Sequence, residues 1–268
     1  MAIHPTAVVG KHCEIDPSAD IGASAVIEDG VCIGENTRIF PHAYISTGTT
    51  IGRGCSIHPF AVVGHWPQDL AWKGEPSFTQ IGDETIIREH ASIHRGTMPG
   101  STTRVGSRCF IMSTAHVGHN CVVGDDVKLA NGALLAGHVH VGDKAFISGH
   151  AMGHQFVRIG SLVMASGGAR LSKDVPPFLI VAPVGPVSIN VIGLRRAGLS
   201  QQERLELHRC YRLLYREGLH FPKAIELVAQ IAESPAGRQL VEFLRAPSKR
   251  GYLPLHRSAL QDDEEPVE

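Results

Sequence analysis

Aliphatic residues recur at every sixth position along most of the first 171 residues of the chain. The series runs from Ile3 to Val63, from Ile81 to Ile93 and from Val105 to Leu171, and in the last run only Gly153 and Ala165 are not large aliphatic residues. Neither an α-helix nor a coiled coil keeps a period of six, whereas the hexapeptide repeat of a parallel β-helix does. The pattern therefore predicts triangular coils of about 18 residues, each made of three short strands and three turns.

The stacking of coils accounts for the composition. Because no coil can bury its apolar residues alone, stability comes from stacking at about 4.8 Å per coil. Glycine is abundant, 29 of 268 residues, and aromatic residues make up only 6%, which fits a thin core of repeated small steps. Cys13, Cys55, Cys109 and Cys121 lie two positions before an aliphatic position, where we expect inward-pointing reduced thiols.

Two segments interrupt the repeat, and a different pattern follows it. Residues 65–80 and 95–104 carry Pro, Gly and polar residues, and we expect both to project from the coil as binding loops. After residue 190 the composition becomes helical: a capping box at 200–203 begins one helix, 222–233 form a second and Ser234-Pro235 begins a third. The sequence predicts a β-helix over 1–189, a helical cap over 190–250 and an acidic tail over 251–268.

Charge and hydropathy exclude two classes of partner. Lys and Arg number 25 and Asp and Glu 26, so there is no basic excess to neutralise nucleic acid. No stretch approaches the roughly 18 apolar residues that an integral membrane segment needs, and the N-terminus lacks the pattern of a signal peptide. We expect a soluble, cytoplasmic protein.

The 18-residue coil predicts which chemically active residues meet. His119, Gly137 and Gln155 are 18 positions apart and should form a column on one edge, with His138 and His154 beside it. Asn120 directly follows His119, and His116 lies nearby.

Three interpretations of this cluster compete. The histidines can form a polar ladder of turn residues without a function. Pairs such as His90 with His94, or His150 with His154, suit zinc, as in trimers that resemble the gamma-class carbonic anhydrases. Alternatively, one neutral histidine acts as a general base, while the amide N–H of Gly137 stabilises an oxyanion.

Seven segments of the chain, in this order, resemble the acyl-carrier-protein-dependent UDP-N-acetylglucosamine O-acyltransferases that open lipid A biosynthesis. They are Gln68-Asp69-Leu70 with Gly74-Glu75-Pro76, Ile93-His94-Arg95-Gly96-Thr97, Ala115-His116-Val117-Gly118-His119, Leu135-Ala136-Gly137-His138-Val139, His154-Gln155-Phe156, Asp174-Val175-Pro176-Pro177, and Asn190 with Gly193-Leu194-Arg195-Arg196. The correspondence covers residues 3–245, both loops included. It implies a left-handed β-helix, a homotrimer with active sites between subunits and acyl carrier protein as donor. Because a thioester needs no metal or redox cofactor to transfer its acyl group, we expect neither.

The resemblance also implies roles for individual residues. His119 matches the general base that deprotonates the sugar 3-hydroxyl, and Gly137 matches the oxyanion donor. The residues matched to substrate binding are His116 by the reacting centre, His138, His154 and Gln155 at the sugar and pyrophosphate, Asn190 and Arg196 at the nucleotide, and Gln68 and Asp69 in a loop that reaches the substrate from a neighbouring subunit. Met164 and Gly167 match the floor of the acyl groove, where a glycine leaves room for a longer chain.

Several positions depart from the family. Asn120 stands where the family places an Asp that orients the catalytic histidine, and because an amide supplies no charge we expect a slower chemical step. Ala71 and Ile192 replace a family lysine and glutamate, and 181–189 is about two residues short. Residues 195–250 carry five more basic than acidic residues, which fits both an anionic nucleotide and an acidic carrier protein. Three alternatives stay open: a UDP 3-amino sugar as acceptor, a zinc hydratase, and a scaffold without catalysis.

Overall fold

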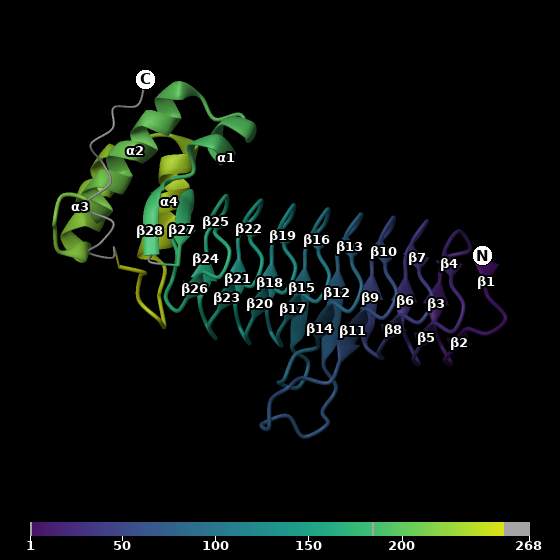
Figure 1. Cartoon of the computed structure of the whole chain (residues 1–268). Helices are drawn as coiled ribbons and strands as arrows, with labels where there is room; N and C mark the ends of the chain where they lie inside the picture. The colour runs from purple at the N-terminus through teal and green to yellow at the C-terminus, as the bar shows by residue number, and fades with distance from the viewer. Residues whose placement is uncertain (1, 184, 255–268) are drawn as a thin grey trace.

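A prism of stacked coils ends in a small helical cap in the computed structural model, which describes residues 2–183 and 185–254 (Figure 1). Three sheets form the sides of the prism. We call them sheets A, B and C.

Sheet A has eleven strands, β1 (Ala2–Ile3), β4 (Asp20–Ile21), β7 (Arg38–Ile39), β10 (Ser56–Ile57), β13 (Ile86–Ile87), β16 (Phe110–Ile111), β19 (Lys128–Leu129), β22 (Phe146–Ile147), β25 (Met164–Ala165), β27 (Leu179–Ala182) and β28 (Gly185–Ile189). Sheet B has nine, β2 (Val8–Val9), β5 (Val26–Ile27), β8 (Tyr44–Ile45), β11 (Val62–His65), β14 (Ser92–His94), β17 (His116–Val117), β20 (Leu134–Leu135), β23 (Met152–Gly153) and β26 (Arg170–Leu171). Sheet C has eight, β3 (Glu14–Ile15), β6 (Cys32–Ile33), β9 (Thr49–Ile51), β12 (Phe78–Ile81), β15 (Thr102–Val105), β18 (Val122–Val123), β21 (His140–Val141) and β24 (Arg158–Ile159).

Strand pairing confirms the predicted period. Val117 pairs in parallel with Leu135, 18 positions further on. The spacing widens only where the two loops leave the prism: Ile57 pairs with Ile87, and Ile87 pairs with Ile111. The loops therefore add residues between strands without changing which residues point inward.

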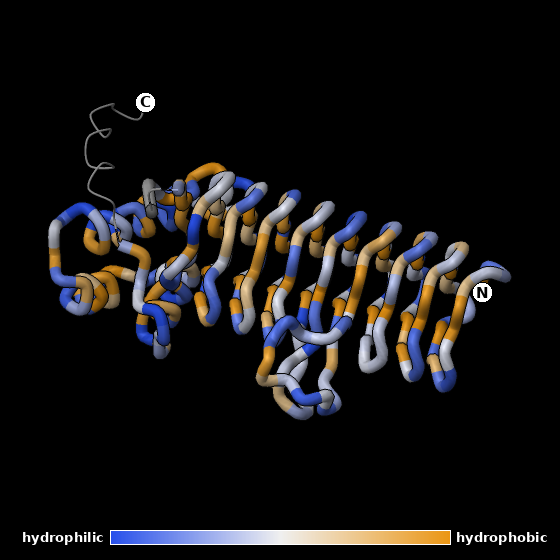
Figure 2. Tube along the Cα trace, turned by 60° about the horizontal axis from the view of Figure 1, so that its bottom comes forward, coloured by the Kyte–Doolittle hydropathy of each residue, from blue (hydrophilic) through white to orange (hydrophobic). Residues whose placement is uncertain are grey.

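The core is a file of aliphatic side chains along the prism axis. From Ile21 to Leu171 the large aliphatic residues of the repeat are at most 3% exposed, and Figure 2 shows hydrophobic positions recurring in each coil. Burying each such side chain contributes about 1.5–3 kcal/mol. Cys55, Cys109 and Cys121 are buried as expected, whereas Cys13, in the first coil, is only half-buried because no coil precedes it.

The cap follows an antiparallel hairpin. Strand β27 continues sheet A and turns back as β28, which is not a further hexapeptide coil. The helices α1 (Val191–Arg196), α2 (Gln201–Tyr215), α3 (Phe221–Ile231) and α4 (Pro235–Arg245) follow. The predicted capping box between Ser200 and Glu203 begins α2, and Ser234 caps α4. No helix in the described part of the chain has the length and apolar character needed to cross a membrane.

The chain after α4 differs from the predicted tail. We predicted an acidic tail from residue 251, but Asp174 N–H donates to Gly251 O at 2.8 Å, and Leu253 N–H donates to Asp174 O at 2.9 Å. Leu253 is 7% exposed. Residues 251–254 therefore belong to the fold, because this segment pairs with the end of the prism. The rest of the predicted tail, 255–268, lies outside the described residues.

Candidate active site

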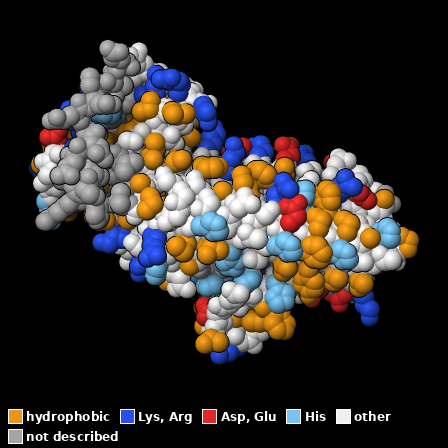
Figure 3. Space-filling model, viewed as in Figure 1, with side chains coloured by type: hydrophobic (Ala, Val, Ile, Leu, Met, Phe, Trp, Pro, Cys, Tyr) orange, Lys and Arg blue, Asp and Glu red, His pale blue; other side chains and the backbone are white. Residues whose placement is uncertain are grey.

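The candidate residues gather where sheet B turns into sheet C, and we call this line of turns the histidine edge. The predicted loop 65–80 is shorter in the structure, where residues 66–77 join β11 to β12, and the predicted loop 95–104 is likewise reduced to residues 95–101, which join β14 to β15. The turns holding His119, Gly137 and Gln155 join the next three pairs of B and C strands. Figure 3 shows histidines gathered over the middle of the prism, next to the projecting loops.

The predicted column of His119 and Gly137 is present. A Cβ atom added to Gly137 would collide with Nε2 and Cε1 of the His119 ring, so the imidazole lies directly against this main chain. His138 N–H donates to His119 O at 2.9 Å, which joins the two turns. His119 is 5% exposed. Only glycine leaves room for the ring at this position.

The amide N–H of Gly137 is buried, and among the described residues it has no hydrogen-bond acceptor. On the edge where sheet C turns into sheet A, which we call the charged edge, an aspartate of a following coil caps several of the equivalent amides. Ser107 N–H donates to Asp125 Oδ1 at 2.8 Å, and Asp125 N–H donates to Asp143 Oδ1 at 2.9 Å. In the coil after Gly137 this position is held by Gln155, which is exposed. The free N–H can therefore stabilise an oxyanion.

Two side chains hold the other face of the His119 ring. Nδ1 lies 2.6 Å from Thr97 Oγ1 and 3.0 Å from Asn120 Oδ1, which also accepts the Thr97 backbone N–H at 2.9 Å. Because that amide oxygen is an acceptor, we assign the ring proton to Nδ1, which leaves Nε2 unprotonated. Thr97 belongs to one of the matched motifs, but its sequence position does not indicate this contact.

The loop 66–77 reaches the same ring. Asp69 Oδ2 lies 3.6 Å from His119 Nε2. The resemblance implies that Gln68 and Asp69 serve the site of a neighbouring subunit, but here Asp69 lies beside the histidine of its own chain. This carboxylate can balance the charge of His119 once the ring is protonated.

A second group of histidines lies just behind. His116 Nδ1 is 2.8 Å from Ser92 Oγ, and its ring meets His94 edge-on with centroids 4.9 Å apart. His94 is 7% exposed, and its Nδ1 has no partner within the described structure. Burial, then the charges of His116, His65 and His119, lower the pKa of His94 to about 4. Burial also lowers the pKa of His116, so both rings are neutral near pH 7.

The row continues towards the cap. The His138 ring meets His119 edge-on at 5.2 Å and stacks on Phe156 at 4.7 Å. Burial is the main cause of its lowered pKa, followed by the charges of His119 and Lys249. His154 and Gln155 are exposed on the same edge.

Four predicted residues lie elsewhere in the chain. Asn190 caps α1, accepting Gly193 N–H at 2.9 Å and donating from Nδ2 to Leu162 O at 2.8 Å, so its amide is engaged internally. Arg196 is exposed at the end of α1. Met164 lies on sheet A, and Gly167 lies in the turn from sheet A to sheet B. One chain therefore does not bring these four residues to His119.

The candidate zinc ligands also lie apart. His90 stacks on Phe60 at 5.2 Å, where sheet A turns into sheet B, whereas His94 lies next to His116. Within residues 2–183 and 185–254, no three His, Cys, Asp or Glu side chains are placed to hold a metal ion.

Known proteins match along almost the whole chain. The family model described as "Udp N-acetylglucosamine O-acyltransferase; Domain 2" matches residues 174–253, and the bacterial transferase hexapeptide model matches 6–41, 33–65 and 102–137. A protein from Syntrophobacter fumaroxidans named acyl-[acyl-carrier-protein]–UDP-N-acetylglucosamine O-acyltransferase is 42% identical over 257 residues, covering 94% of this chain and 100% of its own length. The chain belongs to the UDP-N-acetylglucosamine O-acyltransferase family.

Other members of this family agree in sequence and fold. A relative of the same name from Thermodesulfovibrio yellowstonii is 40% identical over 93% of this chain and 98% of its own. The UDP-N-acetylglucosamine acyltransferase of Francisella novicida superposes with a TM-score of 0.91 at 37% identity, covering 98% of this chain and 100% of its own. That of Campylobacter jejuni has a TM-score of 0.88 at 35% identity, over 95% and 100%. The predicted fold class, a left-handed parallel β-helix with a C-terminal helical domain, is confirmed.

Proposed function

We propose that this protein transfers an acyl chain, a 3-hydroxyacyl chain in our interpretation, from acyl carrier protein to the 3-hydroxyl of UDP-N-acetylglucosamine, the first step of lipid A biosynthesis. The observation that carries the proposal is the contact between the His119 imidazole and the main chain of Gly137, whose N–H is free. A general base beside an oxyanion donor is what acyl transfer to a hydroxyl requires.

The geometry suggests the following steps. Nε2 of His119 takes the proton of the 3-hydroxyl as its oxygen attacks the thioester carbonyl, and the carbonyl oxygen becomes an oxyanion that accepts the Gly137 N–H. The intermediate collapses, the C–S bond breaks, and the thiolate leaving group takes the proton from the imidazolium. Thr97 and Asn120 keep the proton on Nδ1, and Asp69 balances the transient positive charge.

The remaining residues of the histidine edge bind the acceptor in this proposal. His138, His154 and Gln155 follow His119 towards the cap in steps of one coil, about 4.8 Å each. A sugar with its pyrophosphate can extend along this row, with its 3-hydroxyl at His119, and His116 closes the site behind the reacting centre.

We propose that the functional unit is a homotrimer in the cytoplasm. Met164, Gly167, Asn190 and Arg196 have assigned roles but lie away from the histidine edge of their own chain, so a neighbouring copy would supply them. The outward face of sheet B carries Leu134 and Met152, 41% and 37% exposed, which suits contact between copies. Native mass spectrometry should give three times the 28.8 kDa of one chain. All six cysteines are free thiols, as is usual for cytoplasmic proteins.

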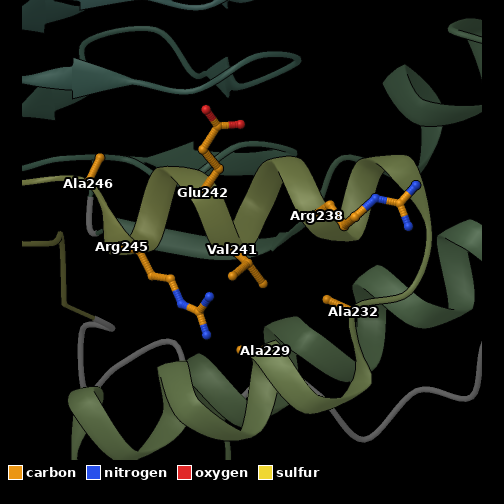
Figure 4. A pocket seen from close by; sticks show the side chains of 7 residues that line it. All are labelled: Ala229, Ala232, Arg238, Val241, Glu242, Arg245 and Ala246. Carbon is orange, nitrogen blue, oxygen red and sulfur yellow. The ribbon is translucent and has the colours of Figure 1, made fainter.

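The carrier protein would dock on the basic cap. A groove of about 630 Å³ lies between α3 and α4, lined by Ala229, Ala232, Arg238, Val241, Glu242, Arg245 and Ala246 (Figure 4). Its two arginines suit an acidic helix, while its alanines and valine provide an apolar floor.

The experiment that tests the proposal identifies the acceptor sugar. The purified protein is given acyl carrier protein loaded with a 3-hydroxyacyl chain and an equal mixture of UDP-N-acetylglucosamine and its 3-amino analogue, and the products are separated by mass spectrometry. We expect the O-acylated sugar. A product that is only the amide would assign the enzyme to N-acylation, and no acylated product would contradict acyl transfer.

A further inference from the structure

Basic residues end the histidine edge on the side of the cap. Lys173 is exposed in the last turn of this edge, and Lys249 and Arg250 come from the segment that follows α4. Figure 3 shows basic side chains next to the row of histidines where this segment returns to the prism. None of the proposed steps above uses these residues.

The segment is fixed to the prism by hydrogen bonds on both sides of its turn. Arg250 Nε donates to Ser172 O at 3.2 Å, and Gly251 O accepts Asp174 N–H at 2.8 Å. Tyr252 Oη donates back to Leu244 O at 2.7 Å. Lys249 is thus a cation on an anchored backbone.

Lys249 continues the row that begins at the catalytic histidine. Its Nζ lies 4.6 Å from the centre of the Phe156 ring, which stacks on His138, which in turn meets His119. The charge of Lys249 helps to lower the pKa of His138, as expected for a nearby cation. Phe156 is two coils beyond the turn of His119, or about 10 Å along the edge.

The nearby carboxylate does not neutralise this cation. Asp174 is completely buried, and its Oδ2 lies 2.7 Å from Arg158 Nε. Lys249 and Lys173 therefore present positive charge to a ligand that lies along the edge.

We propose that Lys249, supported by Lys173, forms a phosphate subsite that holds an anionic phosphate ester of one substrate about two coils from His119. The inference rests on the proposed function. Two substrates carry such a group, the nucleotide with its pyrophosphate and the carrier protein with the phosphodiester of its pantetheine arm. An exposed ammonium adds modest affinity, so we expect removal of its charge to weaken binding roughly fivefold.

The test compares Lys249→Gln with Lys249→Arg, which keeps the charge, and with Lys144→Gln, which removes an exposed lysine from the charged edge. Calorimetry gives Kd values for UDP-N-acetylglucosamine, UDP and uridine, and initial rates give KM for acyl carrier protein. If the pyrophosphate occupies the subsite, Lys249→Gln raises the Kd of UDP roughly fivefold and leaves that of uridine unchanged. If the carrier phosphate occupies it, only the KM for acyl carrier protein rises.

Either result supports the subsite, provided that Lys249→Arg restores most of the loss. The subsite is refuted if the parent protein transfers acyl chains while Lys249→Gln matches Lys144→Gln in every Kd and KM. A parent protein that transfers no acyl chain would instead refute the proposed function, and the UDP arm of the binding experiment still tests the subsite.

Discussion

The charged edge and the part of the histidine edge around Gly137 are built from the same turn, yet the same amide is capped in one and free in the other. On the charged edge an aspartate of a following coil accepts the N–H of Arg53, Ser107 and Asp125, and in the first coil of the histidine edge Asp29 does the same for Lys11. On the histidine edge Gln155 leaves the N–H of Gly137 without an acceptor, and the His119 ring fills the space over the glycine. An unsatisfied buried N–H costs about 1–3 kcal/mol, so the chain gives up stability at the position where an oxyanion would need a donor.

Removing the imidazole of His119 should have the largest effect on the histidine edge. We expect His119→Ala to lower kcat by about 10²–10⁴, because general-base assistance is lost. The Kd for UDP-N-acetylglucosamine should change little. His12→Ala, in an exposed turn of the same edge far from the loops, is the matched control and should keep full activity.

The second largest effect on kcat should come from placing an aspartate cap, like those of the charged edge, next to Gly137. In Gln155→Asp the new carboxylate can accept the Gly137 N–H and repel the oxyanion, so we expect kcat to fall about a hundredfold. Gln155→Ala leaves the N–H free and should mainly raise KM. Equal kcat values for the two variants would show that this amide takes no part in the reaction.

The support for the imidazole should matter less than the imidazole itself. Thr97→Val removes the hydroxyl that lies 2.6 Å from Nδ1, and we expect kcat to fall roughly tenfold, as for loss of an orienting hydrogen bond, with KM unchanged. Thr97→Ser should recover most of the rate. If serine and valine behave alike in steady-state assays, the hydroxyl has no orienting role.

Placing a negative charge beside the His119 ring should raise kcat a few-fold. Asn120→Asp places a carboxylate next to Nδ1, which stabilises the imidazolium and should raise kcat. A stabilised imidazolium also loses its proton at higher pH, so the acid limb of the pH–rate profile should shift to higher pH. An unchanged or lower plateau rate would contradict the role given to Asn120.

The last effect concerns stability rather than the reaction rate and comes from the buried ring of His94. Burial lowers its pKa from 6.5 to about 4, so the unfolded state binds more protons between these values and stability falls as the pH drops through them. The free energy of unfolding should lose at most about 3 kcal/mol from this residue between pH 7 and pH 4. His94→Phe should flatten that slope in urea titrations, and an unchanged slope would mean that His94 is solvated.

The sequence was sufficient to predict what the repeat controls and little of what lies outside it. The 18-residue register predicted that His119 lies against Gly137, and the helix-capping residues predicted where α2 and α4 begin. Both predictions depend on local spacing. Thr97 and Asp69 lie in loops that have no register, so their contacts with His119 depend on how the loops fold back.

Other misses have a different physical cause. Asn190 and the segment 251–254 owe their positions to tertiary hydrogen bonds with Leu162 and Asp174, which no periodicity predicts. The resemblance named Asn190 as a nucleotide contact, and the structure adds a capping role in its own chain.

A crystal structure with bound UDP-N-acetylglucosamine tests the central claim most directly, because the claim is that acyl transfer takes place on the histidine edge. The account predicts that the sugar 3-hydroxyl oxygen lies within about 2.6–3.2 Å of His119 Nε2, with the Gly137 N–H still free beside it. A sugar bound on either of the other two edges, or one whose 3-hydroxyl lies out of reach of Nε2, would contradict it.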